Sequence, residues 1–576
     1  MSIERVENVL RRKRLTLIPI NCLHPDDQLY TVLAFQPYGN LESSNTFLKN
    51  CDREGVKRKF SEFIKLAGSK AIDLAITPEY ACPWEVIEDS IQNNWLPKQG
   101  KIWIFGCESI TPTELDELAD RHKNIKWIYE RITPSMGKTF LDPACLIFNA
   151  RDSNGKNHTV FIVQFKNCAM GDRRYNFERD KLLLGTRSYV LSNDENSIFL
   201  HVLICSDALN FSWKALPQHL QQPYLICHLQ LNLDPQSIHI RPYRQEAYRK
   251  GWASKEFFCL NWAKGFKVSG FNQSSFGGSV LFTKASDSDL NLTDERLSNN
   301  HIKGFYYTRL EKLYAHSFVF NYGEHAFLFR TTKCSQALAA PPAQKRTGPE
   351  MLDVFVWHLH NAEWRRIESV DDGFSSACGQ IGGDLSTLLD QSLTRINIER
   401  LLTLSSGKIR GGEGEDWYDP KRIIYFNVRE DEIVQRLTVA DDPDRIVNDE
   451  RNQVLQLFSE LKNNITKIAC NFPITLKGLR DRCQVNYSNN RNEFNFNLYS
   501  EDRSAKGTGA FIGAKSESDA RRIFNDMADL LGNDQSTLVV WYFLGGRFQY
   551  IFDNQDKITK AYSEGRKSIT KEGEDE

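Results

Sequence analysis

Short apolar runs alternate with amphipathic stretches along the first 330 or so residues of the chain. Apolar runs of about four to eight residues between turn residues are typical of buried strands. By this criterion we expect strands at residues 31–35, 72–76, 103–105, 145–148, 160–163, 198–204, 280–282 and 327–329. Apolar positions at helical spacing predict a helix over residues 52–70, and the turn-rich residues 151–157 predict a hairpin. Alternating strands and helices indicate an α/β sheet covered by helices.

Three chemically reactive residue types follow three of these predicted strands. Glu79 comes just after the run at residues 72–76, Lys166 follows the run that begins at residue 160, and Cys205 comes directly after residues 198–204. Functional residues of α/β sheets gather at the carboxyl ends of strands. A cysteine nucleophile needs a base for its proton and a cation or donors for the oxyanion. We therefore expect one site with Cys205 as nucleophile, Glu79 as base and Lys166 as oxyanion partner.

The motifs around these residues resemble the nitrilase, or carbon–nitrogen hydrolase, superfamily over roughly residues 15–332. Residues 73–80 (DLAITPEY) look like its strand ending in Pro-Glu, residues 161–166 (FIVQFK) resemble its lysine strand, and residues 203–207 (LICSD) look like its nucleophile elbow. Further similar elements are WIFG at 103–106, Phe177-Glu178 followed by Gly185, LNWAKG at 260–265 and FGGS at 276–279. Each motif alone is weak, and their order and spacing carry the resemblance.

The resemblance implies an αββα sandwich that hydrolyses a non-peptide C–N bond through a cysteine thioester. An amide is favoured over a nitrile as the substrate. The resemblance also implies that Glu178 supports Lys166 and the substrate. We expect no cofactor and no metal, a small amide-like molecule as the ligand, and a homo-oligomer.

Two departures from the family pattern leave the substrate class open. Ser206 stands where an aromatic residue usually follows the nucleophile, so that wall of the pocket is expected to be smaller or more polar, and we count Ser206 and Asp207 as candidate substrate contacts. In the stretch after Lys166, Cys168 is either an alternative thiol or a structural residue. Arg173 and Arg174 either hold a substrate carboxylate or phosphate by bidentate contacts or lie in a solvated loop.

The chain has 576 residues, which is too long for one hydrophobic core. A composition break at residues 339–349 (AAPPAQKRTGP) reads as a linker. We expect a hydrolase domain over residues 1–335, a linker over 336–349, a smaller α+β module over 350–565 and a charged tail over 566–576. In the module we expect strands at 423–426 and 538–544 and helices at 454–461 and 518–531. No motif ties the module to chemistry, and we assign it to partner binding, oligomerisation or substrate selection.

Charge and cysteine usage limit the environment and the partners. The chain carries 73 Lys and Arg against 74 Asp and Glu, which argues against non-specific nucleic-acid binding by the whole protein. Aromatic and basic residues at 494–506 make either a stacking face for nucleic acid or a half-buried strand. Thirteen cysteines without a CxxC pair are typical of a reducing compartment. With no membrane-spanning run and no signal-peptide pattern, we expect a cytoplasmic protein.

Two functional hypotheses follow. In the first, the protein is an amidase-type enzyme. In the second, the nitrilase-like fold is a scaffold, and the protein acts as a binding, sensor or effector subunit of a multi-component bacterial system. A pocket in which Glu79, Lys166 and Cys205 converge favours the enzyme, whereas a pocket plugged by residues 167–176 favours the scaffold.

Overall fold

A computed structural model of the chain describes residues 2–559 apart from several gaps. The gaps are residues 25–28, 136, 171–175, 212–215, 217–222, 236–254, 274–276, 285–293, 311–314, 333–348, 383–384, 390–392, 410–436, 440–444, 473, 487–495, 533–536 and 553–557. The predicted linker between residues 336 and 348, the strand at 423–426 and the charged tail lie outside the described residues.

The chain divides into two compact units. The main parts of the first are Met1–Leu292 and Ile302–Val370, and those of the second are Thr293–His301, Asp371–Arg429 and Val434–Glu576. The predicted boundary near residue 350 is therefore wrong. Strand β21 (Glu350–His358) pairs with β20 (His325–Thr331), and β22 (Glu363–Ile367) pairs with β21, so the chain returns to the first sheet after the proline-rich stretch.

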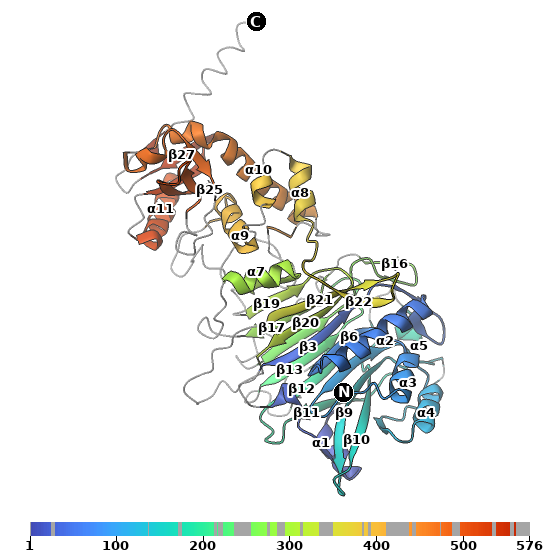
Figure 1. Ribbon diagram of the computed structural model, residues 1–576. Helices are drawn as coiled ribbons and strands as arrows, with labels where there is room; N and C mark the ends of the chain where they lie inside the picture. Colours follow the sequence, from blue (N-terminus) through green and yellow to red (C-terminus); the bar gives the residue numbers. More distant parts are fainter. Residues whose placement is uncertain are drawn as a thin grey trace. The chain divides into compact units, whose positions relative to one another are not determined.

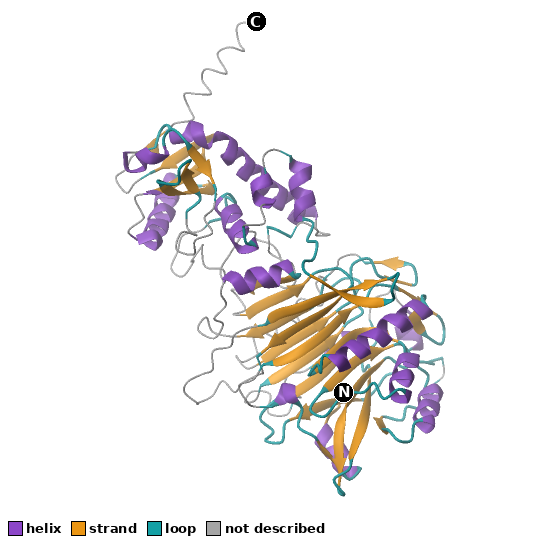
Figure 2. Cartoon of the chain, viewed as in Figure 1, coloured by secondary structure: helices purple, strands orange, loops and turns teal. Residues whose placement is uncertain are grey.

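Two large sheets form the first unit (Figures 1 and 2). The ten-stranded sheet has the order β22, β21, β20, β3 (Tyr30–Gln36), β6 (Leu74–Cys82), β7 (Ile102–Cys107), β9 (Pro143–Asp152), β10 (Asn157–Phe165) and β8 (Lys126–Tyr129), with β2 (Leu15–Leu17) beside β9. The eight-stranded sheet has the order β1 (Ser2–Arg5), β11 (Arg187–Ser192), β12 (Phe199–Ile204), β13 (Tyr224–Leu229), β14 (Lys255–Leu260), β17 (Val280–Lys284), β19 (Ala315–Phe320) and β18 (Phe305–Leu310). A small sheet joins β16 (Phe271–Asn272), β15 (Lys267–Val268), β4 (Asn40–Ser43) and β5 (Leu48–Asn50).

Helices α2 (Arg53–Ser69), α3 (Trp84–Gln92) and α4 (Pro112–Arg121) cover one face of the ten-stranded sheet (Figure 1). The predicted helix is α2, and it begins where the Asp52 side chain accepts a hydrogen bond from the Gly55 N–H. On its buried face, the rings of Phe60 and Phe63 lie 4.9 and 5.5 Å from Phe35 of β3. A spacing of three residues puts both rings on one side of the helix.

The opposite face of this sheet meets the eight-stranded sheet, as the Gln164 side chain of β10 shows by donating to the Val202 carbonyl of β12 over 3.0 Å. Helix α1 (Val6–Arg12) packs beside β11, and α5 (Asn176–Lys181) follows the gap after Met170. Two short 3-10 helices complete the unit, η1 (Asn21–Leu23) and η2 (Cys205–Asn210). The expected α/β class and two-sheet sandwich are confirmed.

The second unit is a mixed six-stranded sheet with helices around it (Figure 2). Its sheet has the order β23 (Cys483–Val485), β24 (Leu498–Ser500), β25 (Lys506–Ala514), β26 (Leu538–Leu544), β27 (Arg547–Ile551) and β28 (Ile558–Thr559). Its helices are α7 (Asp294–Ile302), α8 (Phe374–Ile381), α9 (Arg395–Leu404), α10 (Arg445–Ala469) and α11 (Glu517–Leu531), with 3-10 turns η5 (Ser386–Leu389) and η7 (Ile474–Leu479). The helices and the strand expected at 454–461, 518–531 and 538–544 fall in α10, α11 and β26.

Two smaller points complete the fold. The rings of Phe496 and Tyr499 are 2% and 4% exposed, so they are buried and do not form an open stacking face. Tyr499 lies in β24, and Phe496 precedes that strand. Within the described residues, no helix is long and apolar enough to span a membrane.

Candidate active site

Glu79 lies inside strand β6 and not after its end as the sequence predicted. Its neighbour Tyr80 has a φ of 55°, and the pairing with β7 shifts register between Thr77 and Cys82, so the strand bulges at this point. Gly106 of β7 makes room for the bulge, because a Cβ there would lie 2.1 Å from the carbonyl oxygen of Pro78. Bulges redirect a side chain within a sheet. The side chain of Glu79 is fully buried here.

Lys166 follows β10 directly and is also fully buried. Its Nζ lies 2.6 Å from Oε1 of Glu79 and 2.7 and 2.9 Å from the two carboxylate oxygens of Glu178. Burial alone would lower the pKa of Lys166, but the carboxylates of Glu178 and Glu79 outweigh burial and raise this pKa well above its ordinary value. Lys166 therefore carries a fixed positive charge in the site.

Glu178 of α5 is held by more than its contact with Lys166. It accepts hydrogen bonds from the Tyr80 hydroxyl over 3.1 Å and from the Met170 N–H over 2.7 Å. These donors fix Glu178 behind the ammonium of Lys166. Its expected role in supporting Lys166 and the substrate stays a prediction.

Cys205 is the first residue of η2, directly after β12. Its φ is 38°, in the left-handed region that is uncommon for a residue with a side chain. Burial raises the pKa of its thiol well above the ordinary value, and the charge of Glu79 adds to this, while Lys166 and the Leu231 N–H oppose it. The thiol is therefore neutral at rest, and it lies close enough to Glu79 and Lys166 for their charges to act on it.

The backbone around Cys205 is tied to the neighbouring strand β13. The His228 ring lies 2.9 Å from the Cys205 carbonyl oxygen through Nε2, and the Gln230 amide lies 2.9 Å from His228 Nδ1. A donating Gln230 amide leaves the ring proton on Nε2, where His228 donates it to Cys205. The Leu231 N–H donates to Oε2 of Glu79 over 2.5 Å. One stretch of β13 and the following residues thus contacts both the nucleophile and the base.

Asp142 is a site residue that the sequence argument missed. It directly precedes β9, and its Oδ2 lies 3.5 Å from the Lys166 Nζ. The register of the β9–β10 hairpin pairs Pro143 with Phe165, and it continues to a hydrogen bond from the Lys166 N–H to the Asp142 carbonyl. The predicted hairpin could have identified Asp142, because extending the β9–β10 register by one pair beyond Pro143 and Phe165 sets Asp142 opposite Lys166.

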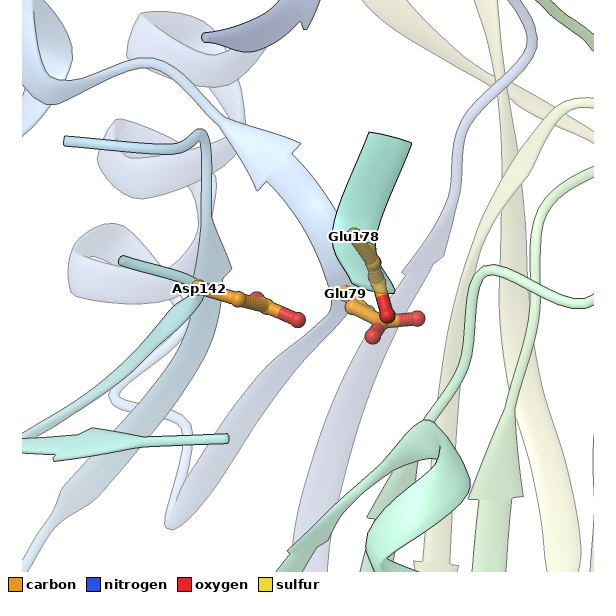
Figure 3. Close-up of side chains that lie close together, drawn as sticks. All are labelled: Glu79, Asp142 and Glu178. Atoms are coloured by element: carbon orange, nitrogen blue, oxygen red, sulfur yellow. The ribbon is translucent and has the colours of Figure 1, made fainter. Parts of the chain in front are cut away.

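Three carboxyl groups converge at this point, from Glu79, Asp142 and Glu178 (Figure 3). In the part of the chain that the structure describes, this is the group compact enough to chelate a metal ion, with one oxygen of each within 4.8 Å of the others. The ammonium of Lys166, however, lies within 3.5 Å of all three. The three carboxyl groups therefore surround the Lys166 ammonium, which occupies the place that a metal ion would take.

Ser206 and Asp207 make contacts that differ from the expected substrate contacts. The Ser206 hydroxyl donates to the Cys168 carbonyl over 2.6 Å, and Oδ1 of Asp207 accepts from the N–H groups of Asn167 and Cys168 over 2.7 and 2.8 Å. Both side chains therefore hold the half-buried segment after Lys166 in place by giving its backbone hydrogen-bond partners. Burial raises the pKa of Asp207 to about 7.

Of the remaining candidates, the structure describes Cys168 but not Arg173 and Arg174. Cys168 is half-buried, and its thiol accepts a contact from the Asn210 amide at 2.8 Å. Asn261 binds the Asn232 and Gly277 carbonyls, which ties loops together beside the site. Arg173 and Arg174, with most of the loop that was expected to plug or open the pocket, lie outside the described residues.

The comparisons with known proteins add little to this geometry. No family model matches the chain, and no curated protein matches it. Among solved structures, the chain is similar to a glutamine-dependent NAD(+) synthetase from Cytophaga hutchinsonii, at 8% identity and a TM-score of 0.26. The match covers 89% of this chain and 65% of that chain, so this chain spans under two thirds of its length. A TM-score of 0.26 does not establish a shared fold.

Proposed function

We propose that the first unit is a hydrolase of a non-peptide C–N bond, with an amide favoured over a nitrile. The observation that carries the proposal is the position of Lys166, whose buried ammonium bridges Glu79 and Glu178 beside the Cys205 thiol. A buried charge bound this tightly is costly to assemble. A structural core needs no such charge next to a cysteine on a strained turn, whereas acyl transfer needs each of these groups.

In the proposed mechanism, the Glu79 carboxylate takes the thiol proton as the Cys205 sulfur attacks the amide carbon. The resulting oxyanion lies beside the Lys166 ammonium, which stabilises it electrostatically. Glu79 passes the proton to the leaving amine, the C–N bond breaks, and a thioester remains on Cys205. A water molecule then gives a proton to Glu79 and attacks the thioester, which releases the carboxylic acid and returns the proton to the thiol.

The neutral thiol fits this scheme. A cysteine that ionised at rest would not need a base, but burial and the Glu79 charge raise the pKa of Cys205 and keep the proton on sulfur. Proton transfer is therefore coupled to attack on the substrate. Glu178, held by Tyr80 and Met170, is proposed to keep the Lys166 ammonium charged and in position.

The test is a panel of primary and secondary amides and nitriles, with released ammonia or amine as the readout. Wild-type protein is compared with Cys205→Ala, Glu79→Gln and Cys168→Ala, the last being a matched control at a second thiol near the site. The two site variants are expected to lose turnover, Glu79→Gln by about 10²–10⁴-fold. With a slow substrate, mass spectrometry is expected to find the acyl group on the Cys205 peptide. An acyl group on Cys168, or full turnover by Cys205→Ala, would overturn the proposal in favour of a scaffold.

A further inference from the structure

Asp142 has no role in the mechanism above, although its carboxyl group points toward Glu79 and Glu178 (Figure 3). Its side chain is fully buried, and Oδ2 lies 3.5 Å from the Lys166 Nζ. A buried carboxyl group in a site of this kind is either a third negative charge or a neutral acid. The surrounding donors distinguish these two states.

The three carboxyl groups differ in the hydrogen bonds that they accept. Glu178 accepts from Lys166 with both oxygens, from the Tyr80 hydroxyl and from the Met170 N–H. Glu79 accepts from Lys166 and from the Leu231 N–H. Among the described residues, no N–H or O–H group donates to either oxygen of Asp142. Hydrogen bonds to a carboxylate favour its charged form, so Asp142 is the least stabilised as an anion.

The net charge of the site leads to the same conclusion. With Glu79, Glu178 and Asp142 all ionised around the one ammonium of Lys166, the fully buried cluster would carry two excess negative charges. Carboxylates that share a buried site do not all ionise, and the one with the poorest partners keeps its proton. Asp142 lies within hydrogen-bonding reach of Glu79, and two carboxyl groups form a hydrogen bond only when one of them holds a proton.

We propose that Asp142 keeps its proton in the working site, donates it in a hydrogen bond to Glu79, and acts as a positioning residue for the base. This inference rests on the proposed function of the site. Burial raises the pKa of Asp142 well above its ordinary value, and the charge of Glu79 raises it further against the opposing charge of Lys166. The other titratable groups that face it are Glu178 and Tyr80.

The proton on Asp142 has a consequence for catalysis. Once Glu79 has taken the thiol proton, the charges of Glu178 and Lys166 balance, so a neutral Asp142 leaves no excess negative charge beside the forming oxyanion, whereas an ionised Asp142 adds one. Like charge near a developing negative charge raises the barrier. The protein is therefore expected to lose thiol reactivity at alkaline pH as Asp142 ionises. Asp142→Asn, which cannot ionise, is expected to lack this alkaline limb.

The decisive measurement needs no substrate. Infrared difference spectra of full-length wild type minus Asp142→Asn at neutral pH are expected to show the C=O stretch of a protonated carboxylic acid, shifted by ¹³C-aspartate labelling. Asp73→Asn is the matched control. Asp73 pairs with Lys101 and accepts a hydrogen bond from the Thr31 N–H. Burial would raise the pKa of Asp73, but its hydrogen bonds outweigh burial and hold this pKa below the ordinary value. The difference spectrum of wild type minus Asp73→Asn is therefore expected to show carboxylate bands. Carboxylate bands from Asp142 would overturn the proposal.

Two further measurements keep the proposal testable. If Asp142→Asn does not fold, the acid band is sought in ¹³C-aspartate-labelled Asp207→Asn protein, because the pKa of Asp207 is also raised, to about 7. Iodoacetamide alkylation of Cys205, followed against pH by mass spectrometry, is expected to fall at high pH in wild type and not in Asp142→Asn. An identical alkaline limb in both proteins would contradict the proposal. A protonated Asp142 supports it even if no amide is turned over, which separates it from the hydrolase proposal.

Discussion

The His228 ring donates a hydrogen bond to the carbonyl oxygen of Cys205 over 2.9 Å, from a strand next to the one that ends at the nucleophile. The register pairs Leu203 with His228, so the ring reaches two residues further along the neighbouring strand. Cys205 has a φ of 38°, a conformation that persists only where its surroundings hold it. His228, oriented by Gln230, supplies one such restraint.

Replacing His228 is therefore expected to impair the nucleophile without removing a catalytic group. His228→Leu is expected to lower kcat and the Cys205 alkylation rate by up to about 10²-fold, with a small change in KM, because misplacement of a reacting atom has effects of this size. His228→Gln keeps an N–H donor and is expected to recover part of the loss. His201→Gln is the control, because His201 is equally buried on β12 and bonds the Tyr189 carbonyl instead. Equal losses in the His201 and His228 variants would point to general destabilisation.

The Lys166 ammonium is expected to matter for both stability and activity. Lys166→Met leaves the carboxylates of Glu79 and Glu178 buried without their cation, a kind of change that costs about 3–5 kcal/mol. Activity is expected to fall by about 10²–10³-fold with the loss of an oxyanion donor. Lys166→Arg is not expected to rescue, since a planar fork does not replace a point charge in a tight site.

A double variant separates the two effects of Lys166. Lys166→Met with Glu178→Gln removes one uncompensated charge, so chemical denaturation is expected to show partial recovery of stability with no recovery of turnover. Lys101→Met is the matched control, because Lys101 pairs with Asp73 at a site where its side chain is 18% exposed. Its cost is expected to be smaller than that of Lys166→Met, because Asp73 keeps hydrogen bonds from Asn21 and Thr31. A similar cost at both lysines would contradict the strongly bound ammonium.

Much of this site was predictable because it depends on local patterns. Apolar runs predicted the strands. Lys166 and Cys205 directly follow two of them and Glu79 lies in the bulge of a third, so the two packed sheets bring the three residues together. Asp142 was missed because no motif marks it. Its importance comes from the β9–β10 register, which sets it opposite Lys166. A contact such as that of Asp142 with Lys166 depends on which residues of the two strands pair, and the pattern of apolar residues along the sequence does not specify this register.

Ser206 and Asp207 show contacts that the sequence did not predict, and their contact with substrate stays a prediction. Their place after the nucleophile suggested contact with substrate. In the structure the N–H groups of Asn167 and Cys168 donate to Oδ1 of Asp207, and the Ser206 hydroxyl donates to the Cys168 carbonyl. The sequence shows that a side chain is polar, but it does not show whether its hydrogen-bond partner is the protein backbone or a ligand. The domain boundary failed for a related reason. A proline-rich stretch looked like the end of a unit, although the residues beyond it return to the same sheet.

Asp207 predicts a specific dependence of stability on pH. Its pKa is raised by burial to about 7 in the folded protein from an ordinary value of 3.8, so the folded state binds this proton more tightly than the unfolded state. The stabilisation is complete below pH 3.8 and is lost as pH rises toward 7. Each pH unit in that window is worth at most about 1.4 kcal/mol. In Asp207→Asn the amide oxygen can still accept hydrogen bonds from the N–H groups of Asn167 and Cys168. The melting temperature of this variant is expected to depend less on pH in that window than the melting temperature of wild type. Unchanged slopes in the variant would show that other groups set the dependence.

The corrected boundary predicts which truncated chains fold. Ending the chain after residue 345 removes β21 and β22, which leaves β20 as an unpaired edge and uncovers Phe35, whose ring lies 4.9 Å from Trp364 of β22. Exposed strand edges and apolar patches promote aggregation. A chain ending after Val370 keeps both strands and the hydrogen bond from the Trp364 indole to the Lys59 carbonyl.

We therefore expect the chain that ends after Val370 to be soluble and to melt cooperatively, and the one that ends at residue 345 to aggregate or to melt at a lower temperature. Residues 293–301 belong to the second unit, and both truncated chains lack the rest of that unit. These residues therefore do not account for a difference between the two truncated chains. Trp364→Ala in the full-length protein isolates the packing on Phe35 and is expected to lower stability by up to about 3 kcal/mol, since the side chain is only partly buried. Size-exclusion chromatography and thermal melting measure both outcomes. Equal solubility and stability of the two truncated chains would mean that β21 and β22 do not contribute to the stability of the first unit.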